Sequence, residues 1–259
     1  MKRLLLGLAL AAAVSPAYAA DLFVEEAPVV EVSDDLFDWT GLYVGLQAGY
    51  VNGTVETEDW FCVNNPDDCY GDAPDGSRYI ADLDLSGFKG GAHVGYNQQF
   101  GTLVVGAESQ INLGGGSGDG PFTFVPGDGG EVEISDDESA TYDTLWEGST
   151  RLKLGVALDR LMPYVTGGLA YGQADITAER EFDDGPHDFA YSDINLIGYT
   201  VGAGVAYAVT DEIVIRGEAN YTDYGTTTAA GVDSNQDTHD IEVVGPKQIS
   251  LEAGISFKF

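Results

Sequence analysis

The chain ends in the stretch QISLEAGISFKF, residues 248–259, in which apolar and polar or small residues alternate. The apolar positions are Ile249, Leu251, Ala253, Ile255, Phe257 and Phe259. A two-residue period of this kind is typical of a β-strand with one apolar and one polar face. In a water-soluble sheet the apolar face points inward, whereas in a membrane barrel it points outward to lipid.

Seven earlier stretches show the same period and are predicted as strands. They are residues 41–54, 86–100, 103–112, 144–158, 163–176, 194–208 and 213–224. The connections at Gly101-Thr102, Asp159–Met162 and Val209–Glu212 are short, whereas those at 55–85, 113–143, 177–193 and 225–247 are long, rich in Gly and acidic. This alternation of short and long connections predicts an all-β fold, an eight-stranded antiparallel up-and-down transmembrane β-barrel with short periplasmic turns and long extracellular loops.

The N-terminal region has a different composition from the rest of the chain. Residues 1–19 have a basic start, an apolar run over 4–14 and an Ala-x-Ala sequence at 17–19, which is the pattern of a cleaved secretory signal peptide. Residues 20–40 are acidic and lack a clear period, so we expect a flexible leader. The barrel is predicted to occupy residues 41–259.

Composition restricts the class of protein further. The formal net charge of −32 disfavours any nucleic-acid partner. The chain has no apolar stretch of about 20 residues, the length that a membrane helix needs. Only 11 residues are Lys or Arg, and the polar strand faces consist mostly of Gly, Ser, Thr, Gln and Asn. Such small residues fit the narrow bore of an eight-stranded barrel better than a water-exposed surface.

A few charged residues share the polar strand faces and are predicted to point into the bore, with His93 beside them. They are Lys89, Glu108, Glu147, Arg151, Lys153, Arg216, Glu218, Glu252 and Lys258. Mixed signs in a narrow tube favour a salt-bridged plug, because an unpaired charge there would cost several kcal/mol. The alternative is a narrow path for ions or small solutes whose selectivity these groups tune.

Aromatic residues on the apolar faces are predicted to form two belts at the membrane interfaces. Tyr50, Phe88, Trp146 and Tyr221 fall near the long connections, and Phe100, Tyr207, Phe257 and Phe259 fall near the short turns. Two belts are expected of a membrane barrel. The β-propensity of aromatic residues would also place Tyr and Phe in strands.

Three segments resemble a known family: FDWTGLYVGLQAGYVNG (37–53), WEGSTRLKLGVALDRLMPYVTGGLAYGQAD (146–175) and GYTVGAGVAYAVTDEIVIRGEANYTDYG (198–225). They are similar to small outer-membrane β-barrel proteins of alphaproteobacteria, the porin-family or OmpA- and opacity-like surface antigens. The ending ISFKF resembles the signal, closed by Phe259, through which the barrel-assembly machinery recognises its clients. The resemblance implies an eight-stranded barrel with surface, envelope-structural or weak porin roles, but a ligand known in relatives does not transfer to these acidic loops. The expected partners are outer-membrane lipid, lipopolysaccharide and, during biogenesis, the barrel-assembly machinery, and the extracellular partner is unknown.

The loops contain two candidate sites. Cys62 and Cys69 are close in sequence, and in an oxidising compartment they are expected to form a disulfide, with free thiols or half a metal site as alternatives. DSNQDTHD (233–240) superficially resembles a calcium loop, but Thr238 and Val244 stand where Gly and Glu are required. No cofactor and no specific metal site are therefore predicted, and weak divalent-cation binding stays open.

Function is predicted from these features together. His93, His187 and His239 lack a Ser and an acid at recognisable spacing, so no enzyme activity and no catalytic residue are expected. The sequence predicts an outer-membrane surface protein with an envelope-structural role and at most a narrow pore. The alternatives are a loop-mediated adhesin or ligand-binding receptor, because loops on a rigid scaffold carry specificity, and a small-solute porin.

The cysteine pair can be tested directly. We expect Cys62 and Cys69 in the purified protein to resist alkylation until a reductant is added, because a disulfide leaves no thiolate to react. Mass spectrometry of the alkylated protein, with and without reductant, measures this. Alkylation of both residues without reductant would contradict the prediction.

Overall fold

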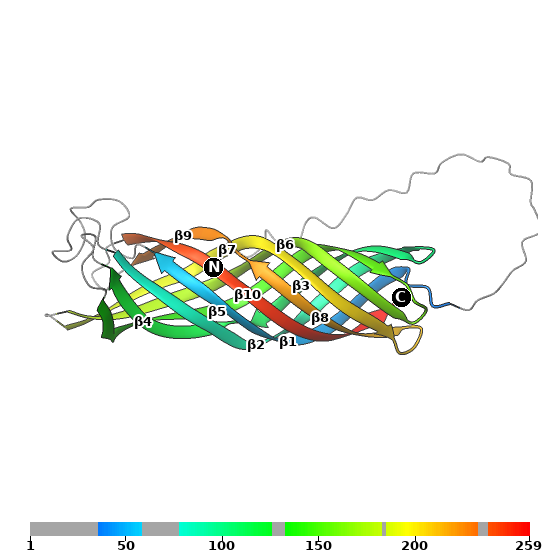
Figure 1. The fold of residues 1–259 in the computed structure, drawn as a ribbon, viewed down its shortest axis with the longest axis horizontal. Helices are drawn as coiled ribbons and strands as arrows, with labels where there is room; N and C mark the ends of the chain where they lie inside the picture. Colours follow the sequence, from blue (N-terminus) through cyan, green and yellow to red (C-terminus); the bar gives the residue numbers. More distant parts are fainter. Residues whose placement is uncertain (1–35, 59–77, 126–132, 183–184, 233–237) are drawn as a thin grey trace, which may run out of the picture. The chain divides into compact units, whose positions relative to one another are not determined.

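The computed structural model describes residues 36–58, 78–125, 133–182, 185–232 and 238–259. All regular secondary structure in these ranges is β-strand (Figure 1). The strands are β1 (Gly41–Glu58), β2 (Arg78–Phe100), β3 (Leu103–Gly114), β4 (Ser117–Val125), β5 (Glu133–Val156), β6 (Leu161–Phe182), β7 (Gly185–Ala208), β8 (Ile213–Asp223), β9 (Thr226–Val232) and β10 (Thr238–Lys258). None of the described residues belongs to a helix long and apolar enough to cross a membrane.

The sheet closes into a ring. Neighbours run in the order β1-β10-β8-β7-β6-β5-β3-β2, and β2 pairs back onto β1. All of these pairs are antiparallel. β4 lies between β2 and β5 beyond the end of β3, and β9 lies between β10 and β7 beyond the end of β8. The ten strands therefore occupy eight positions around the ring, which confirms the predicted eight-stranded antiparallel barrel.

The interruptions that separate β3 from β4 and β8 from β9 have a local cause. Gly114 has φ 74° and Gly225 has φ 64°, in the left-handed region that suits glycine. At each point the chain leaves the strand geometry briefly and then resumes pairing further up the barrel.

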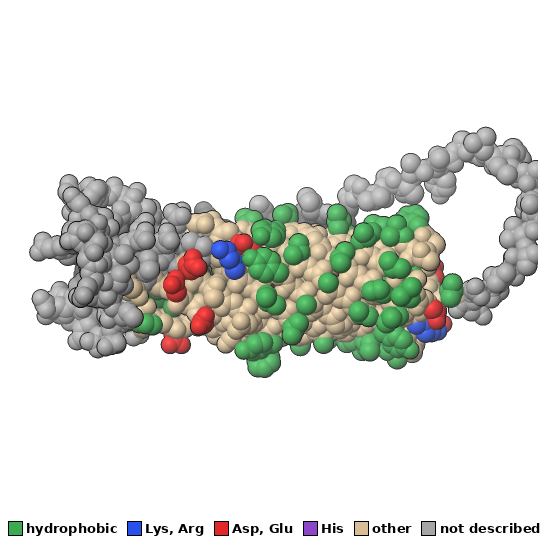
Figure 2. Space-filling model, viewed as in Figure 1, with side chains coloured by type: hydrophobic (Ala, Val, Ile, Leu, Met, Phe, Trp, Pro, Cys, Tyr) green, Lys and Arg blue, Asp and Glu red, His purple; other side chains and the backbone are tan. Residues whose placement is uncertain are grey.

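The predicted division into an apolar and a polar face is confirmed in the half of the barrel near the short turns. Burial alternates along β3 and β8, with every second residue buried and the residues between them exposed or half-buried. Leu251 is 64% exposed, and Leu46 and Ile255 are also exposed, although a water-soluble barrel would pack such residues inside. Figure 2 shows hydrophobic side chains spread over this part of the outer surface. On β1 the outer apolar run from Leu42 to Tyr50 spans roughly 20 Å of height at ordinary strand rise and tilt, close to the apolar band of a membrane barrel.

Further up, the same alternation continues with the chemistry of its two faces exchanged. On β2, Leu83 and Leu85 are fully buried while Asp84 between them is exposed. Three residues later Phe88 is 82% exposed, whereas Lys89 is buried. The pairing of β2 with β1 shows no register shift across this point. The exchange therefore marks the level at which the surroundings of the barrel change from hydrocarbon to water.

The strands extend well beyond the predicted boundaries, and much of the sequence predicted as long loops is strand. β2 begins at Arg78, the connection between β6 and β7 is residues 183–184 alone, and β4 and β9 lie inside predicted loops. These strands were predicted as loops because Asp and Gly occupy their outer positions, where a membrane-spanning strand would have apolar residues. We call this water-exposed part, made of β4, β9 and the strand ends that pair with them, the upper barrel.

Two loop predictions lie partly or wholly outside the described residues. Cys62 and Cys69 fall in the undescribed range 59–77, so the disulfide stays a prediction. Of the calcium-like stretch, residues 233–237 are also outside the described ranges, and Thr238 begins strand β10.

The exchange of faces predicts very unequal effects on stability for two neighbouring residues. Leu83→Ala should lower the free energy of unfolding by about 2–5 kcal/mol, because it leaves a cavity in a buried apolar cluster. Asp84→Ala, one position along and exposed, should change it by no more than about 0.5 kcal/mol. Urea unfolding in detergent micelles measures both values, and equal costs would show that the upper barrel has no apolar interior.

Candidate functional site

The interior of the barrel brings together most of the charged residues predicted to face the bore. Eight are buried: Lys89, Glu108, Glu147, Arg151, Lys153, Arg216, Glu218 and Glu252. The ninth, Lys258, is only half-buried and lies near the short-turn end of β10. They converge because they occupy inward positions of β2, β3, β5, β8 and β10 at similar heights in the ring.

Glu108 on β3 is the centre of a lower charged group. Its Oε1 accepts a bond from Arg151 Nη2 at 2.8 Å. Its Oε2 accepts bonds from Lys153 Nζ at 3.0 Å, Arg216 Nη1 at 2.5 Å and the Tyr43 hydroxyl at 2.8 Å. One buried carboxylate thus binds three cations, and its negative charge is shared among strands β1, β5 and β8.

Arg151, 1% exposed, extends this group to the opposite wall. Its Nη1 contacts Glu218 and donates to Asn220 Oδ1 at 2.7 Å, both on β8. β3 and β8 lie four positions apart in the ring of eight, so the Glu108–Arg151–Glu218 chain spans the bore. The planar guanidinium suits this role because it donates several bonds in fixed directions.

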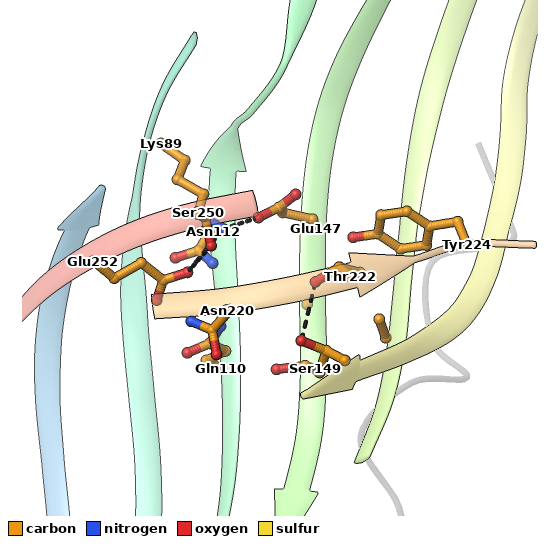
Figure 3. Close-up of a pocket in the computed structure, with 13 residues that line it drawn as sticks. Lys89, Gln110, Asn112, Glu147, Ser149, Asn220, Thr222, Tyr224, Ser250 and Glu252 are labelled. Atoms are coloured by element: carbon orange, nitrogen blue, oxygen red, sulfur yellow. Dashed lines mark hydrogen bonds and ion pairs between the residues drawn. The ribbon is translucent and has the colours of Figure 1, made fainter. Parts of the chain in front are cut away.

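An upper charged group lies nearer to the upper barrel. Lys89 Nζ contacts Glu147 and lies 2.8 Å from Glu252 Oε1. Gln248 Nε2 donates to Glu147 Oε2 at 2.7 Å, and Ser250 Oγ donates to Glu252 Oε1 at 3.2 Å. Figure 3 shows Lys89, Glu147 and Glu252 converging from different strands. Across the two groups, four cations face four carboxylates.

Little space remains at this level. The cavity drawn in Figure 3 has a volume of about 10 Å³, and a second cavity below it, lined by Tyr43, Lys153 and Arg216, has about 30 Å³. A single water needs about 10–15 Å³ measured this way. Asn112 Nδ2, Ser149 Oγ and Asn220 Nδ2 are buried there without a hydrogen-bond partner among the described residues, so ordered water suits the first cavity.

Apolar layers lie above and below the charged groups. The layer above includes Leu83, Leu85, Tyr142, Ile176, Leu196 and Tyr224. The layer below includes Phe37, Trp39, Val104, Met162, Tyr164 and Val214. The described interior is therefore filled in three layers, apolar, charged and apolar.

The predicted interface aromatics lie mostly on the outer surface. Tyr50, Phe88, Phe100, Tyr207, Tyr221, Phe257 and Phe259 are exposed, and Trp146 is half-buried. Tyr50 and Phe88 meet edge to face with ring centroids 5.2 Å apart, and Trp146 Nε1 donates to Gln173 Oε1 at 3.0 Å. Phe259 pairs with β1 through its amide, which donates to Leu42 O at 2.8 Å. The interface and assembly roles of these residues stay predictions.

His93 has a partner that the sequence analysis did not find. Its Nε2 lies 2.7 Å from Ser256 Oγ, although 163 residues separate them. Both pair with Gly45 on β1, where a Cβ would come within 2.5 Å of His93 Nε2, so glycine makes the contact possible. Both side chains are buried, and Nδ1 of His93 has no partner among the described residues. The contact thus links β2 and β10 inside the barrel, on either side of β1.

Sequence comparison places the barrel in a family. The sequence profile described as "Outer membrane protein beta-barrel domain" matches residues 5–259. The chain belongs to this outer-membrane β-barrel family. Its location in the outer membrane and the predicted kinship with small alphaproteobacterial barrels follow from the same match and from the relatives below.

Two relatives cover nearly the whole barrel. The chain is 33% identical to a 31 kDa outer-membrane immunogenic protein of Brucella melitensis biotype 1 over 241 residues, 91% of this chain and 92% of the relative. It is 30% identical to a 25 kDa outer-membrane immunogenic protein of Brucella abortus biovar 1 over 250 residues, 94% and 91% of the two chains. Among solved structures, the outer membrane protein OprG of Pseudomonas aeruginosa is similar with a TM-score of 0.47 and 12% identity, over 85% of this chain and 96% of that one.

Several members of the interior network were missed because they are uncharged. Gln47 accepts a bond from Arg216 Nη2 at 2.6 Å, Gln110 accepts one from Arg151 Nη2 at 3.0 Å, and Tyr43 and Asn220 also bind the charged groups. All lie at inward positions of the barrel strands. The alternation of inward and outward positions along each strand was the sequence signal that could have identified them.

Loss of Arg151 from this outer-membrane barrel should be costly. Arg151→Ala removes a partner of both Glu108 and Glu218 in the buried bore, and we expect about 3–5 kcal/mol less stability. Arg160→Ala is the matched control because the Arg160–Asp211 pair is exposed, and it should cost less than about 1 kcal/mol. Urea unfolding in micelles compares the two, and similar costs would contradict a buried, paired network.

Proposed function

We propose that this protein is an envelope-structural barrel of the outer membrane with a closed interior. The observation that carries the proposal is the three-layered filling of the bore, in which paired charges lie between two apolar clusters. An ion crossing such an interior would have to separate buried ion pairs and then enter an apolar layer. Each step carries a large desolvation cost.

The balance of charge in the two groups also favours a plug over a path. A selective pore needs groups that bind an ion weakly and release it. Here the carboxylate of Glu108 already binds Arg151, Lys153 and Arg216, and Lys89 is held between Glu147 and Glu252. Glu218, which pairs with Arg151, is the fourth carboxylate. Four cations and four carboxylates therefore balance, and the two groups together carry no net charge that would attract a permeant ion.

The upper barrel supports a second role at the cell surface. It continues the strands beyond the apolar band and exposes acidic residues such as Asp82, Asp84 and Asp143. The relatives are named immunogenic proteins, and we propose that the upper barrel is the antigenic part of this chain. An adhesin or ligand-binding role would use the same part of the molecule.

Partners follow from the same proposal. The exposed apolar band is suited to contact with outer-membrane lipid, and the water-exposed upper barrel would then lie at the height of the lipopolysaccharide headgroups. The C-terminal strand, ending at Phe259, would be the segment offered to the barrel-assembly machinery. No cofactor is part of the proposal.

Conductance tests the proposal. In planar lipid bilayers the purified protein should give no stable single-channel steps, because the bore has no continuous water-filled path past the described charged groups. A general porin reconstituted in parallel serves as the positive control, and liposome swelling with small sugars gives a second readout. Reproducible channels of the unmodified protein would refute the closed-barrel function in favour of a small-solute porin.

A further inference from the structure

The five residues before β1 cross the mouth of the barrel at the short-turn end. We call Leu36–Thr40 the strap. It leads into β1, and Phe37 and Trp39 bond to Asp159 in the turn between β5 and β6. In the ring of eight positions, β6 lies directly opposite β1. The strap therefore runs across the opening from one wall to the other.

The aromatic residues of the strap point into the barrel. Trp39 is 2% exposed and Phe37 is buried beside it, with their rings 4.8 Å apart in an edge-to-face arrangement. They pack with Met162, Tyr164 and Val214 in the lower apolar layer. Burial of two large aromatic side chains is a strong reason for a segment to stay in place.

Asp159 holds the strap at the far wall. Its Oδ1 accepts a bond from the Phe37 amide at 3.0 Å, and its backbone carbonyl accepts one from Trp39 Nε1 at 2.9 Å. On β2, the Gln99 side chain accepts a bond from the Trp39 amide at 2.8 Å. Asp159 has φ 55°, a left-handed conformation that costs energy for any residue but glycine. The surrounding structure therefore holds Asp159 in a strained conformation in which it accepts two hydrogen bonds from the strap.

The strap covers a cationic and aromatic chamber. Behind Trp39 lies the cavity of about 30 Å³ lined by Tyr43, Lys153, Tyr164 and Arg216. Lys153 and Arg216 belong to the lower charged group around Glu108, so this group forms the inner wall of the cavity. The strap is thus a closure distinct from the charged groups, and its bonds to Asp159 and Gln99 involve none of them.

We propose that the strap is a lid, latched by Asp159, that seals the periplasmic mouth of the barrel and can be released without breaking the charged network. Its release uncovers the chamber of Lys153, Arg216, Tyr43 and Tyr164 to the periplasm, while the bore above stays closed. The inference assumes the orientation of a closed outer-membrane barrel but does not depend on whether that barrel conducts.

Thiol labelling tests the lid. Ala206, buried on β7, lines the chamber, and Thr102 is exposed in the β2–β3 turn at the same end. In a Cys62→Ser/Cys69→Ser background, Ala206→Cys should react with a charged maleimide at least about tenfold more slowly than Thr102→Cys, because the lid excludes the reagent. Adding Trp39→Gly should raise the Ala206→Cys rate by at least about tenfold, since it removes the buried indole.

Two substitutions at Asp159 isolate the latch. Asp159→Gly relieves the positive φ but removes the acceptor for the Phe37 amide, and it should raise the Ala206→Cys rate by about fivefold, the effect of one lost hydrogen bond. Asp159→Asn keeps an acceptor oxygen and should leave the rate near that of the parent protein.

The Thr102→Cys rate and the heat-dependent gel mobility of each variant report whether the barrel itself has folded. An Ala206→Cys rate that is fast in the parent, or unchanged by both Trp39→Gly and Asp159→Gly, would overturn the lid. Conductance of the parent protein is the separate test of the closed barrel, so the two proposals can fail independently.

Discussion

Two-residue alternation in a closed ring of strands forces every second side chain into a bore only wide enough for side chains. The interior must therefore be filled with mutually compatible groups, whatever surrounds the outside. The barrel satisfies this constraint at three levels. Leu83 and Leu85 fill the upper barrel, ion pairs fill the middle, and Trp39 with Met162 fills the lower mouth. The outside is constrained separately, by hydrocarbon in the middle and by water above.

Much of this arrangement could be predicted from the sequence. Strands such as 248–259 alternate over a long enough run, with apolar residues on the outer face, to reveal the membrane-spanning part and the inward charged residues. The upper barrel was missed because its alternation has the opposite sense: in the run 81–86, Asp82 and Asp84 face out while the leucines face in. Acidic and Gly-rich sequence of this kind has the composition of loops, and the exchange of faces becomes clear only when the register is known.

The partners of the interior charges could not be predicted for a different reason. The alternation along a strand assigns a side chain to the bore, but it does not show which of several opposite charges that side chain contacts. That Glu108 binds Arg151 on a neighbouring strand and Arg216 on the far wall depends on strand tilt and ring order. The strap was not predicted from the sequence for a similar reason. Phe37 and Trp39 lie in a stretch without a period, and their burial depends on a turn 120 residues away. Short-range patterns carry no information about such contacts.

The distribution of charge shows why the middle layer acts as one unit. The lower group has three cations, Arg151, Lys153 and Arg216, against two carboxylates, and the upper group has Lys89 against two carboxylates. Each group alone carries one uncompensated charge, and only together are they neutral. In a bore of low dielectric an isolated charge is expensive, so the two groups stabilise each other across the small polar cavity between them. Opening the bore at one level would therefore disturb the charge balance at the other, which favours a permanently filled interior. The mouth below is closed by apolar contacts and hydrogen bonds, so it is the part of the barrel that can open at the lowest free-energy cost.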